Sequence, residues 1–548
     1  MSTPEYEFGD EWDAVADVVV VGTGAAGGAA AATAAASGAS VIVLEKAGWV
    51  GGTTARSGGV LWVPNNPVMQ AMGLPDERAD ALRYLARSAY PTRYQGGHPT
   101  LGLPGRQYDV LVAFYDHGAE AIEHLTSIGA LAVDHVPYPD YYADLPEDAA
   151  PLGRTMTTRL PEGWTRGISP TGGQLMADAL IEAAQRDGAQ LRLEHEVRHV
   201  LRDEDGRVIG VECRAGTRTV IIGARRGVIF GSGGFIHDRD MRFAYLRGPV
   251  LGSAASETAT GDFVRIGIEV GAELGNMSHA WWDQVAVEHA VTVPSTLKDV
   301  YIPFGDSMFM VNKHGQRVVN EKAVYNDRGT IHFAWDPSRY EYPNLLLFMI
   351  WDQAVMDDPE PSRFRWPVPL PGDPLPNFIA TADTLEGLAT ELRRRLTTLV
   401  QHTAGLTLSD DFEANLDETI ERFNAMALDG VDRDFRRGAS QIERTWAGPP
   451  REGLSSGCLA PLRDQGPYYG LIVGPGALDT KGGPVIDAHA RIQSVDGTPI
   501  HGLYGAGNCI AAPSGQAYWG PGATIGPAIV FGYIAARHAL GAPDEVAS

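Results

Sequence analysis

Hydrophobic and polar positions form their clearest pattern near the N-terminus. Residues 17–21 are mainly apolar and β-branched, an alanine-rich segment then extends to about Ser37, and residues 41–44 are again apolar. A short β-branched run predicts a buried strand, whereas a longer alanine-rich segment closed by a glycine, here Gly38, predicts a helix. The order of these segments predicts a strand–helix–strand unit over residues 17–46.

Later parts of the chain repeat these patterns. Two helices are predicted, one over residues 172–188 and one that residues 520–524 open and that ends near Leu540. Short apolar runs predict strands at Gln190–Val200, Val208–Cys213, Thr219–Ile222, Gly227–Gly234, Leu345–Trp351 and residues 502–508. The stretch from Pro91 to Ser169 is rich in proline, glycine and tyrosine, so we expect loops with short helices there.

Composition divides the chain into two domains. Residues 286–461 are richer in tryptophan, proline and charge and lack a nucleotide-binding pattern, whereas residues 462–548 return to the glycine-rich style of the N-terminal half. A chain of 548 residues also exceeds the size of one compact core. We therefore expect an α/β protein with a Rossmann-like nucleotide-binding domain built from residues 1–285 and 462–548. Residues 286–461 would be inserted in it as an α+β catalytic cap domain.

The loop between the first strand and the first helix has the sequence GTGAAG at residues 22–27. In a dinucleotide-binding fold, Gly22 and Gly24 let the backbone approach a pyrophosphate at the N-terminus of the helix, and Gly27 lets helix and strand pack closely. Glu45 ends the second strand 18 residues after Gly27, near the usual position of the acid that holds a ribose. The whole pattern predicts a dinucleotide site, which a glycine motif alone does not.

Charge and cysteine content exclude several classes of partner. The chain has 44 Lys and Arg against 68 Asp and Glu, a net charge of -24, which disfavours binding to nucleic acid and to anionic membranes. Cys213, Cys458 and Cys509 are far apart and form no CxxC pair, so we expect no metal site. The sparse cysteines, the acidic N-terminal segment and the lack of an apolar run of roughly 18 residues favour a cytoplasmic protein without a transmembrane segment.

Two further glycine-rich regions favour FAD over NAD as the cofactor. Residues 51–59 (GGTTARSGG) follow Glu45, and residues 502–508 (GLYGAGN) precede the glycines of residues 520–524. FAD is long and buried along its length, whereas NAD usually needs only the first cluster, and a helix N-terminus near residue 524 favours the negative charge of a reduced flavin. The predicted FAD ligands are Gly22, Gly24, Ala25, Ala26, Gly27, Glu45, Lys46, Gly52, Thr53, Thr54, Ser57, Gly58, Gly59, Val197, Gly231, Gly233, Gly507, Asn508, Ala523, Thr524 and Ile525.

Five further motifs rich in tyrosine, tryptophan and glycine accompany the glycine clusters. They are Pro139–Tyr142, Ala280–Trp282, Asn320–Glu321 followed by Tyr325, Asp479–Gly483 and Tyr518–Gly522. Together these motifs resemble those of FAD flavoproteins of the fumarate reductase/succinate dehydrogenase superfamily, and most closely those of 3-ketosteroid Δ1-dehydrogenases. The resemblance covers nearly the whole chain, and the tyrosines are its more specific part because the glycine motifs are shared across the superfamily.

The resemblance implies a dehydrogenation beside a ring ketone, in which a base removes the proton alpha to the carbonyl and a hydride leaves the beta carbon for flavin N5. The hydroxyl of Tyr518 and the backbone N–H of Gly522 would donate to the carbonyl oxygen, because the enolate needs donors placed in advance. Tyr325 would be the base. A free phenol has a pKa of about 10, so Tyr141 would support the tyrosinate by hydrogen bonding, and the adjacent Tyr142 is the alternative to Tyr141.

The resemblance also bears on the cofactor and the substrate. Residues 55–58 (ARSG) occupy the position at which some relatives carry the histidine of a covalent flavin, so the FAD is expected to be noncovalent. Trp519 replaces the small residue or proline usual in the family, and a bulky indole at the rim of the active site favours a smaller cyclic ketone, such as a cyclohexanone, as an alternative to a steroid. A flavin-dependent ene-reductase acting on an enone or a fumarate-like acid is the second alternative, and a non-redox lyase or isomerase is the third.

The implied partners are a small hydrophobic ketone and an electron acceptor that reoxidises the flavin. Several other features are interpreted without a chemical role. His98–Thr100 resembles a dicarboxylate-site motif but lies in a different part of the chain, and Arg393–Arg395 predicts a solvated helix face. Trp281 and Trp282 are expected to wall a pocket or fill the core, and Ser57, Ser514 and the histidines lack the context of a nucleophile.

Overall fold

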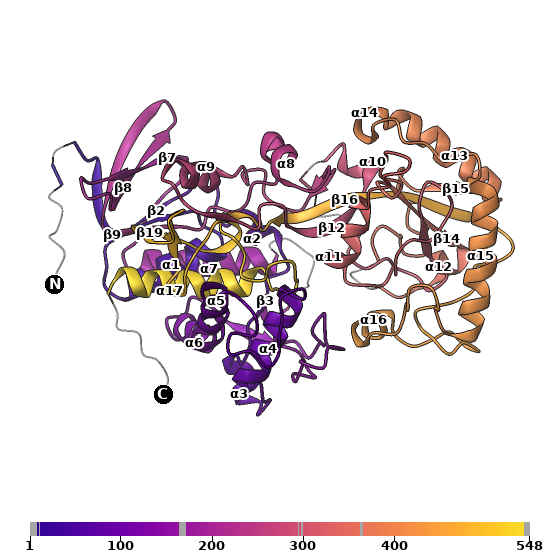
Figure 1. Cartoon of the computed structure of the whole chain (residues 1–548), viewed down its shortest axis with the longest axis horizontal. Coiled ribbons are helices and arrows are strands. Elements are labelled where there is room, and N and C mark those ends of the chain that lie inside the picture. Colours follow the sequence, from indigo (N-terminus) through magenta and orange to yellow (C-terminus); the bar gives the residue numbers. More distant parts are fainter. Residues whose placement is uncertain are drawn as a thin grey trace. The chain divides into compact units, whose positions relative to one another are not determined.

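The computed structural model describes residues 8–9, 11–163, 171–293, 295–296, 300–361 and 365–541. The chain forms two compact units, the first from residues 1–246, 255–280 and 479–548 and the second from residues 247–254 and 281–478 (Figure 1). The second unit therefore extends from residue 281 to residue 478, where the sequence predicts 286 to 461. Its limits coincide with β12 (Ala280–Ala286) and β16 (Tyr468–Thr480), which pair in one sheet.

The first unit is built on a mainly parallel sheet with the strand order β18-β19-β9-β1-β2-β6, from which β8 and β7 extend beside β9. Val18 of β1 lies opposite Val41 of β2, and Val20 lies opposite Ile229 of β9. Strands of parallel sheets are covered on both faces, which explains why β1 carries a continuous apolar run. The strands are β1 (Ala14–Val21), β2 (Val41–Leu44), β6 (Gln190–Arg192), β7 (His195–Arg202), β8 (Val208–Ala215), β9 (Arg218–Phe230), β18 (Arg491–Gln493) and β19 (Pro499–Gly505).

The strand–helix–strand unit predicted over residues 17–46 is confirmed, but three of the later strand predictions are wrong. The strand predicted over residues 190–200 is broken into β6 and β7 at Glu194, whose φ of +57° interrupts the extended conformation. The strands predicted at 219–222 and 227–234 are one strand, β9. It is continuous because its first residues pair with β8 and its last residues pair with β1 and β19.

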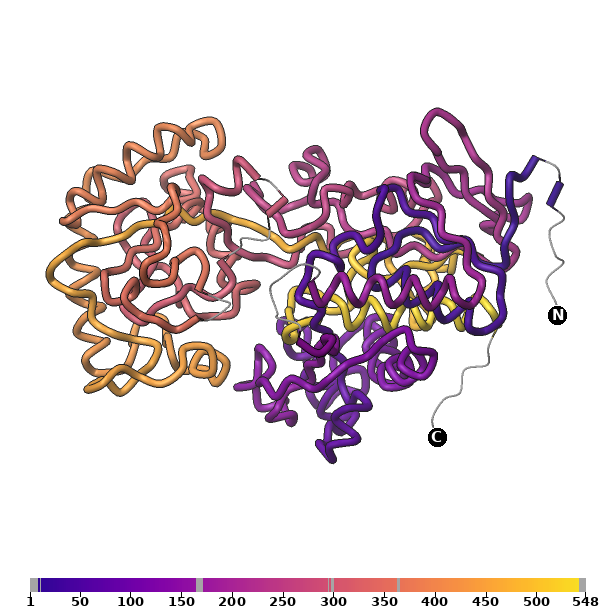
Figure 2. Tube along the Cα trace, turned by 180° about the vertical axis from the view of Figure 1, so that it is seen from behind, coloured from indigo at the N-terminus to yellow at the C-terminus, as the bar shows by residue number. Residues whose placement is uncertain are grey.

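Helix α1 (Ala25–Ala36) packs against the parallel sheet and against α7 (Gly172–Arg186) and α17 (Ile525–Ala539) (Figures 1 and 2). Small residues allow this close packing. A Cβ on Gly28 of α1 would lie 2.9 Å from the Cβ of Leu180 in α7, and a Cβ on Gly532 of α17 would lie 2.4 Å from the carbonyl oxygen of Ala26. The alanine-rich composition of α1 thus reflects close contact with helices that are distant in sequence.

A second layer of the first unit consists of a small antiparallel sheet, β3-β5-β4, and of short helices. The described part of residues 91–169, where loops with short helices are expected, contains α5 and α6, of 12 and 10 residues, and also two short strands, β4 and β5, that the sequence does not predict. The other elements of the first unit are α2 (Gly52–Arg56), β3 (Val60–Trp62), α3 (Pro67–Ala71), α4 (Arg78–Ala89), α5 (Gly105–Asp116), α6 (Gly118–Ser127), β4 (Val133–His135), β5 (Thr155–Thr158), α8 (Arg239–Tyr245), α9 (Asp262–Glu269), β11 (Leu274–Gly275), β17 (Gly483–Pro484) and η2 (Gly507–Cys509).

The second unit is built on the sheet β10-β16-β14-β13, to which β12 and β15 add by pairing with β16. Odd-numbered residues of β14 (Leu347–Asp352) enter one hydrophobic cluster and even-numbered residues enter another, so the predicted buried strand at 345–351 is confirmed. The other elements are β10 (Gly252–Ser253), α10 (Val287–Ala290), β13 (Phe309–Val311), α11 (Tyr325–Arg328), η1 (Gly329–Phe333), α12 (Gln353–Asp357), β15 (Ala380–Ala382), α13 (Leu385–Thr398), α14 (Val400–Thr403), α15 (Phe412–Asp429) and α16 (Gln441–Ala447). Among the described residues, no helix combines the length and the apolar character that a membrane span requires.

We expect Gly27→Ala to destabilise the first unit. A Cβ on Gly27 would lie 2.0 Å from the carbonyl oxygen of Gly22, so α1 would have to move away from β1. Overpacking typically costs about 1–3 kcal/mol, and urea titration should show a loss of this order in the free energy of unfolding. Gly105→Ala is the control, because a Cβ there meets nothing within 4 Å. Equal stability of the two variants would contradict the close contact between α1 and the turn after β1.

Candidate functional site

The first candidate site lies where parallel strands of the first unit end. Residues 22–24 follow β1, residues 231–233 follow β9, and residues 507–508 follow β19. Because these three strands are neighbours in the sheet and run in parallel, their carboxyl ends meet at one edge. That edge is where open α/β sheets bind nucleotides. The structure thus brings together three groups of predicted FAD ligands that are far apart in sequence.

The N-terminus of α1 is open at this edge. Its N-cap residue is Gly24, which has no side chain to accept a hydrogen bond, and the N–H of Ala25 donates to Oγ1 of Thr54 at 2.9 Å. The turn before it is tight, since a Cβ on Gly22 would lie 2.5 Å from the carbonyl oxygen of Gly231. A helix N-terminus attracts phosphate groups, and the glycines at this one let them approach the N–H groups that Thr54 does not cap.

Glu45 lies directly after β2 and is buried, with 7% of its surface exposed. Its carboxylate accepts hydrogen bonds from the N–H and the hydroxyl of Thr23, at 3.1 and 2.7 Å, and from the N–H of Ala47 at 2.9 Å. The acid is therefore held next to the turn after β1, as a ribose-binding acid requires. Open backbone for phosphate and a fixed acid for ribose together fit a dinucleotide such as FAD.

The other predicted FAD ligands belong to the same unit and make local contacts. Lys46 donates to Asp262 at 2.6 Å and to Thr260 at 2.7 Å, so its ammonium is engaged at the start of α9. Ser57 donates to the carbonyl of Thr54 at 2.8 Å. The remaining ones lie in α2 and the turn after it (Gly52, Thr53, Gly58, Gly59), in β7 (Val197) and at the start of α17 (Ala523, Thr524, Ile525).

Asp479 has no role in the sequence-based prediction, yet it joins two of the loops that carry predicted FAD ligands. Its carboxylate accepts from the N–H of Gly234 at 3.0 Å and from the side-chain amide of Asn508 at 3.1 Å. The hydroxyl of the next residue, Thr480, accepts from the N–H of Phe235 at 2.9 Å. The loops after β9 and β19 are thereby fixed to each other. The signal in the sequence is the motif Asp479–Gly483 itself, whose polar residues precede two glycines.

The second candidate site is a pair of tyrosine-bearing loops in the first unit. The ring of Tyr141 lies against the ring of Tyr518, with centroids 5.4 Å apart and planes inclined at 49°. The backbone N–H of Tyr518 donates to the hydroxyl of Tyr142 at 3.1 Å, and the N–H of Tyr141 donates to the carbonyl of Trp519 at 3.0 Å. The two adjacent tyrosines thus have different contacts: Tyr141 faces the Tyr518 ring, whereas Tyr142 holds the Tyr518 backbone.

Arg154 fixes the first of these loops. It is fully buried and donates twice to Asp76, both at 2.8 Å, and also to Asp140 at 2.5 Å and to Asp148 at 2.8 Å. Burial raises the pKa of Asp140 to about 6 and also raises the pKa of Asp148, a neighbouring carboxylate adds to each shift, and the Arg154 guanidinium opposes both. Since Asp140 directly precedes Tyr141, this ion cluster holds the backbone from which the tyrosine projects.

Lys481 fixes the second loop. It is fully buried, and its ammonium donates to the carbonyls of Ala517 at 2.5 Å and Gly515 at 3.2 Å. The peptide between Ala517 and Tyr518 is therefore held at both ends, its carbonyl by Lys481 and its N–H by the hydroxyl of Tyr142. The sequence does not predict this role of Lys481, because its acceptors are backbone carbonyls and every residue has one.

Gly522 closes the same loop against β3. Its φ is +92°, and a Cβ there would lie 2.5 Å from the backbone of Leu61, so only glycine fits without displacement. Its carbonyl accepts from the N–H of Trp62 at 3.1 Å. The residue that the resemblance implies as a backbone donor thus lies in a loop anchored to a strand.

Trp519 corrects the expectation of an indole at the rim of an active site. The side chain is fully buried, and its ring stacks between those of Trp62, at 5.5 Å, and Phe114, at 5.7 Å. A residue that lined an accessible pocket would retain exposed surface, and Trp519 has none. It acts as a core residue below the Tyr518 loop, so it gives no reason to prefer a smaller substrate.

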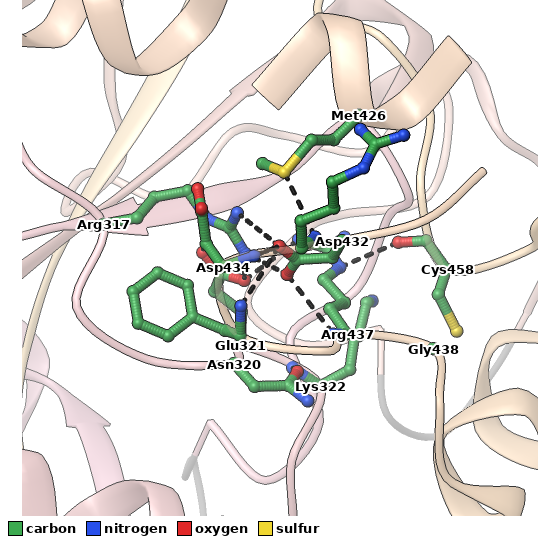
Figure 3. Close-up of polar contacts among 12 residues, drawn as sticks. Arg317, Asn320, Glu321, Lys322, Met426, Asp432, Asp434, Arg437, Gly438 and Cys458 are labelled. Atoms are coloured by element: carbon green, nitrogen blue, oxygen red, sulfur yellow. Dashed lines mark hydrogen bonds and ion pairs between the residues drawn. The ribbon is translucent and has the colours of Figure 1, made fainter. Parts of the chain in front are cut away.

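Tyr325 lies in the second unit, as the first residue of α11, and is 6% exposed. Its ring meets the ring of Tyr301 edge to face, with centroids 5.3 Å apart. The chain that leads into it is fixed at Glu321, which accepts two hydrogen bonds from Arg317, both at 2.8 Å, and one from Arg437 at 3.3 Å (Figure 3). Although burial opposes ionisation of Glu321, the two guanidinium groups lower its pKa.

The residues to which the sequence analysis assigns no chemical role mostly make local structural contacts. The N–H of Thr100 donates to His98 in an exposed turn. The solvated helix face expected at Arg393–Arg395 is wrong for Arg395, whose side chain is 12% exposed and pairs with Glu288 and Glu391. Trp281 and Trp282 are buried in β12. Within the described ranges, no group of three or more His, Cys, Asp or Glu side chains is placed to hold a metal ion.

Comparison with known proteins identifies one family and several relatives. A family model described as FAD binding domain matches residues 17–525. The 3-oxosteroid 1-dehydrogenase of Mycolicibacterium smegmatis is 32% identical, with 97% of each chain covered. The 4-oxocyclohexanecarboxylate 2-dehydrogenase of Sinomonas cyclohexanicum is 31% identical, with 96% of this chain and 93% of that protein covered. The solved structure of 3-ketosteroid delta1-dehydrogenase from Sterolibacterium denitrificans in complex with 1,4-androstadiene-3,17-dione is 28% identical, with a TM-score of 0.79 over 96% of this chain and 100% of that chain.

We expect Arg154→Met to be strongly destabilising, because it leaves three buried carboxylates without their cation. Breaking a buried pair by removing one partner costs roughly 3–5 kcal/mol, which urea unfolding would measure. Arg159→Met is the matched control, since Arg159 pairs with Asp134 at the surface and such pairs contribute about 0–1 kcal/mol. If both variants lost the same small amount, Arg154 would not anchor the Tyr141 loop.

Proposed function

The chain belongs to the FAD-dependent 3-ketosteroid Δ1-dehydrogenase family, and from that premise we propose that it introduces a carbon–carbon double bond beside the ketone of a ring substrate. It is an FAD-dependent oxidoreductase with the fold of the fumarate reductase flavoprotein superfamily. The observation that carries the proposal is the contact between the rings of Tyr141 and Tyr518, on two loops that buried cations hold.

In the proposed reaction, Tyr518 and Gly522 bind the ketone oxygen of the substrate. The phenolic hydroxyl and the backbone N–H would donate to that oxygen and stabilise the negative charge it gains when the neighbouring carbon loses a proton. Both residues belong to one loop held by Lys481 and β3, which supports donors fixed before the substrate arrives. Tyr325 would accept the proton as general base, and Tyr141 would be the further tyrosine of the catalytic set.

A bound FAD would supply the hydride acceptor for the β carbon of the substrate. We propose that the open N-terminus of α1 binds its phosphates, that Glu45 binds its ribose, and that no covalent bond forms, because residues 55–58 contain no histidine. Turnover then requires an electron acceptor as the second partner. Three buried free thiols, Cys213, Cys458 and Cys509, suit a reducing compartment and support a cytoplasmic enzyme.

A 3-ketosteroid is the substrate class that we propose first. The relatives that support it are named as acting on 3-oxosteroids. The buried position of Trp519 removes the reason to expect a narrowed pocket. A small cyclic ketone is the second candidate, because a relative of nearly equal identity is named for 4-oxocyclohexanecarboxylate.

Anaerobic titration of the flavinated protein tests both substrate classes. We expect androst-4-ene-3,17-dione to bleach the oxidised flavin band, because hydride transfer reduces the FAD. If 4-oxocyclohexanecarboxylate bleached the band and the steroid did not, the substrate class would be small ring ketones. If neither compound reduced the flavin, the proposal of a ketone dehydrogenase would be wrong. As a control, exposure to air should restore the band, which would show that the bleaching was caused by reduction of the flavin.

We expect Tyr518→Phe to retain FAD but to lose turnover by about 10²–10³-fold, because the developing enolate loses one donor. Steady-state rates and the ratio of flavin to protein would measure the two effects separately. Tyr469→Phe is the control, since its buried hydroxyl donates to Gln353 at 2.6 Å in the second unit. Near-normal turnover of Tyr518→Phe would remove this hydroxyl from the mechanism.

A further inference from the structure

Arg328 lies one helical turn after Tyr325 and is 1% exposed. Its guanidinium makes five hydrogen bonds, of which four go to backbone carbonyls. Nη1 donates to Glu321 at 3.0 Å and to Ala323 at 2.8 Å, and Nη2 donates to Val300 at 2.7 Å and to Tyr301 at 2.9 Å. The fifth bond, from Nε, goes to the side-chain oxygen of Gln284 at 2.6 Å.

These acceptors belong to the two segments that define the position of Tyr325. Glu321 and Ala323 lie in the loop that leads into α11, so Nη1 fixes the chain just before the tyrosine. Tyr301 packs its ring edge to face on the ring of Tyr325, so Nη2 fixes the residue that contacts the phenol ring. The Arg328 side chain therefore fixes both the backbone that leads into Tyr325 and the residue that packs on the Tyr325 ring.

The guanidinium is also a cation whose hydrogen-bond acceptors are all neutral. Glu321, whose carboxylate faces the same region, is paired instead with Arg317 and Arg437 (Figure 3). Burial lowers the pKa of Arg328 to about 10, and the negative charges of Asp283, Glu321 and an ionised Tyr325 oppose that shift. The interaction is reciprocal, so a charged Arg328 favours the ionised form of Tyr325.

Other titratable groups lie on the described elements around this site, among them Lys322 of the loop before α11, whose pKa burial lowers to about 7, and Asp327 of α11. Asp283 comes from β12, Glu321 from the loop before α11, Tyr301 from the segment beside it, and His332 from η1. Burial lowers the pKa of His332 to about 4, so this imidazole is neutral over the working range of an enzyme. Arg328 is the cation whose electrostatic interaction with Tyr325 favours the ionised phenol.

We propose that Arg328 is a positioning residue for Tyr325, which it holds through the carbonyls of the preceding loop and of Tyr301 while placing a positive charge one turn away. The assignment of Tyr325 as the base rests on the proposed function. The contacts of Arg328 with the Tyr325 segment are independent of any substrate.

A titration without substrate tests the effect on the phenol. The near-ultraviolet absorbance of tyrosinate is recorded against pH for the FAD-loaded enzyme and for its Tyr325→Phe variant, and the difference gives the pKa of Tyr325. We expect Arg328→Met to raise that pKa by roughly one unit, because the cation is lost. Arg328→Lys keeps the charge and should shift it by less than about half as much. An unchanged pKa in folded, flavinated Arg328→Met would overturn the electrostatic part of the proposal.

Kinetics test the positioning. We expect Arg328→Lys to lower kcat by about 10-fold with little change in KM, because a single ammonium cannot hold four carbonyls in the guanidinium geometry. The activity of Arg328→Met should rise toward higher pH, where Tyr325 still ionises. Wild-type kcat in Arg328→Lys would overturn the positioning role, and this conservative variant decides the question even if Arg328→Met does not fold.

Arg365→Lys is the matched control. Arg365 is also buried in the second unit, and its hydrogen bonds to described residues go to the carbonyls of Pro369, Glu360 and Val355. It should lose stability without a change in the pKa of Tyr325 or in the pH profile. If it reproduced both effects of the Arg328 variants, general destabilisation would explain them and the proposal would fail. A wild-type enzyme that no ketone reduces would instead defeat the proposed function and leave the substrate-free titration valid.

Discussion

Buried cations that donate hydrogen bonds to carboxylates or to backbone carbonyls are the interaction on which the tyrosine-bearing segments depend. Arg154 holds the Tyr141 loop through Asp140, Lys481 holds the Tyr518 loop through two carbonyls, and Arg328 holds the chain around Tyr325 through four. A buried charge without partners is very unfavourable. Each cation therefore stabilises the fold only while its acceptors keep their places, and this requirement fixes loops that hydrophobic contacts alone would leave adjustable.

The nucleotide-binding part of the first unit is specified differently, by steric limits on the backbone. The turn after β1, the start of α1 and the loop after β9 approach one another at distances that exclude a Cβ. Polar side chains then join the loops, with Glu45 held at the first turn and Asp479 connecting the loops after β9 and β19. Glycine allows the backbone segments to approach closely, and the buried carboxylates of Glu45 and Asp479 hold these segments in place.

Much of this arrangement follows from local sequence. The β-branched run, the glycine turn and the alanine-rich helix predict the strand–helix–strand unit, because each depends on neighbouring residues. The continuity of β9 and the burial of Trp519 could not be predicted, because each depends on partners supplied by distant segments. Arg154, Lys481 and Arg328 escaped prediction for a related reason. Their acceptors are carbonyls, which every residue carries, or aspartates that look like any other surface acid in the sequence.

The sheet order of the first unit has a consequence for how the protein is made. β19 pairs with β9, and α17 packs on α1, so elements from the last part of the chain complete a sheet and a helical layer begun by its first residues. Between them, the ribosome synthesises the whole second unit, which has its own sheet and its own hydrophobic clusters. The second unit can therefore fold during synthesis, whereas the first must wait with an unpaired strand edge. The first unit is therefore completed late in synthesis. A chain that stops before α17 lacks the helix that packs on α1, so its FAD-binding domain is incomplete.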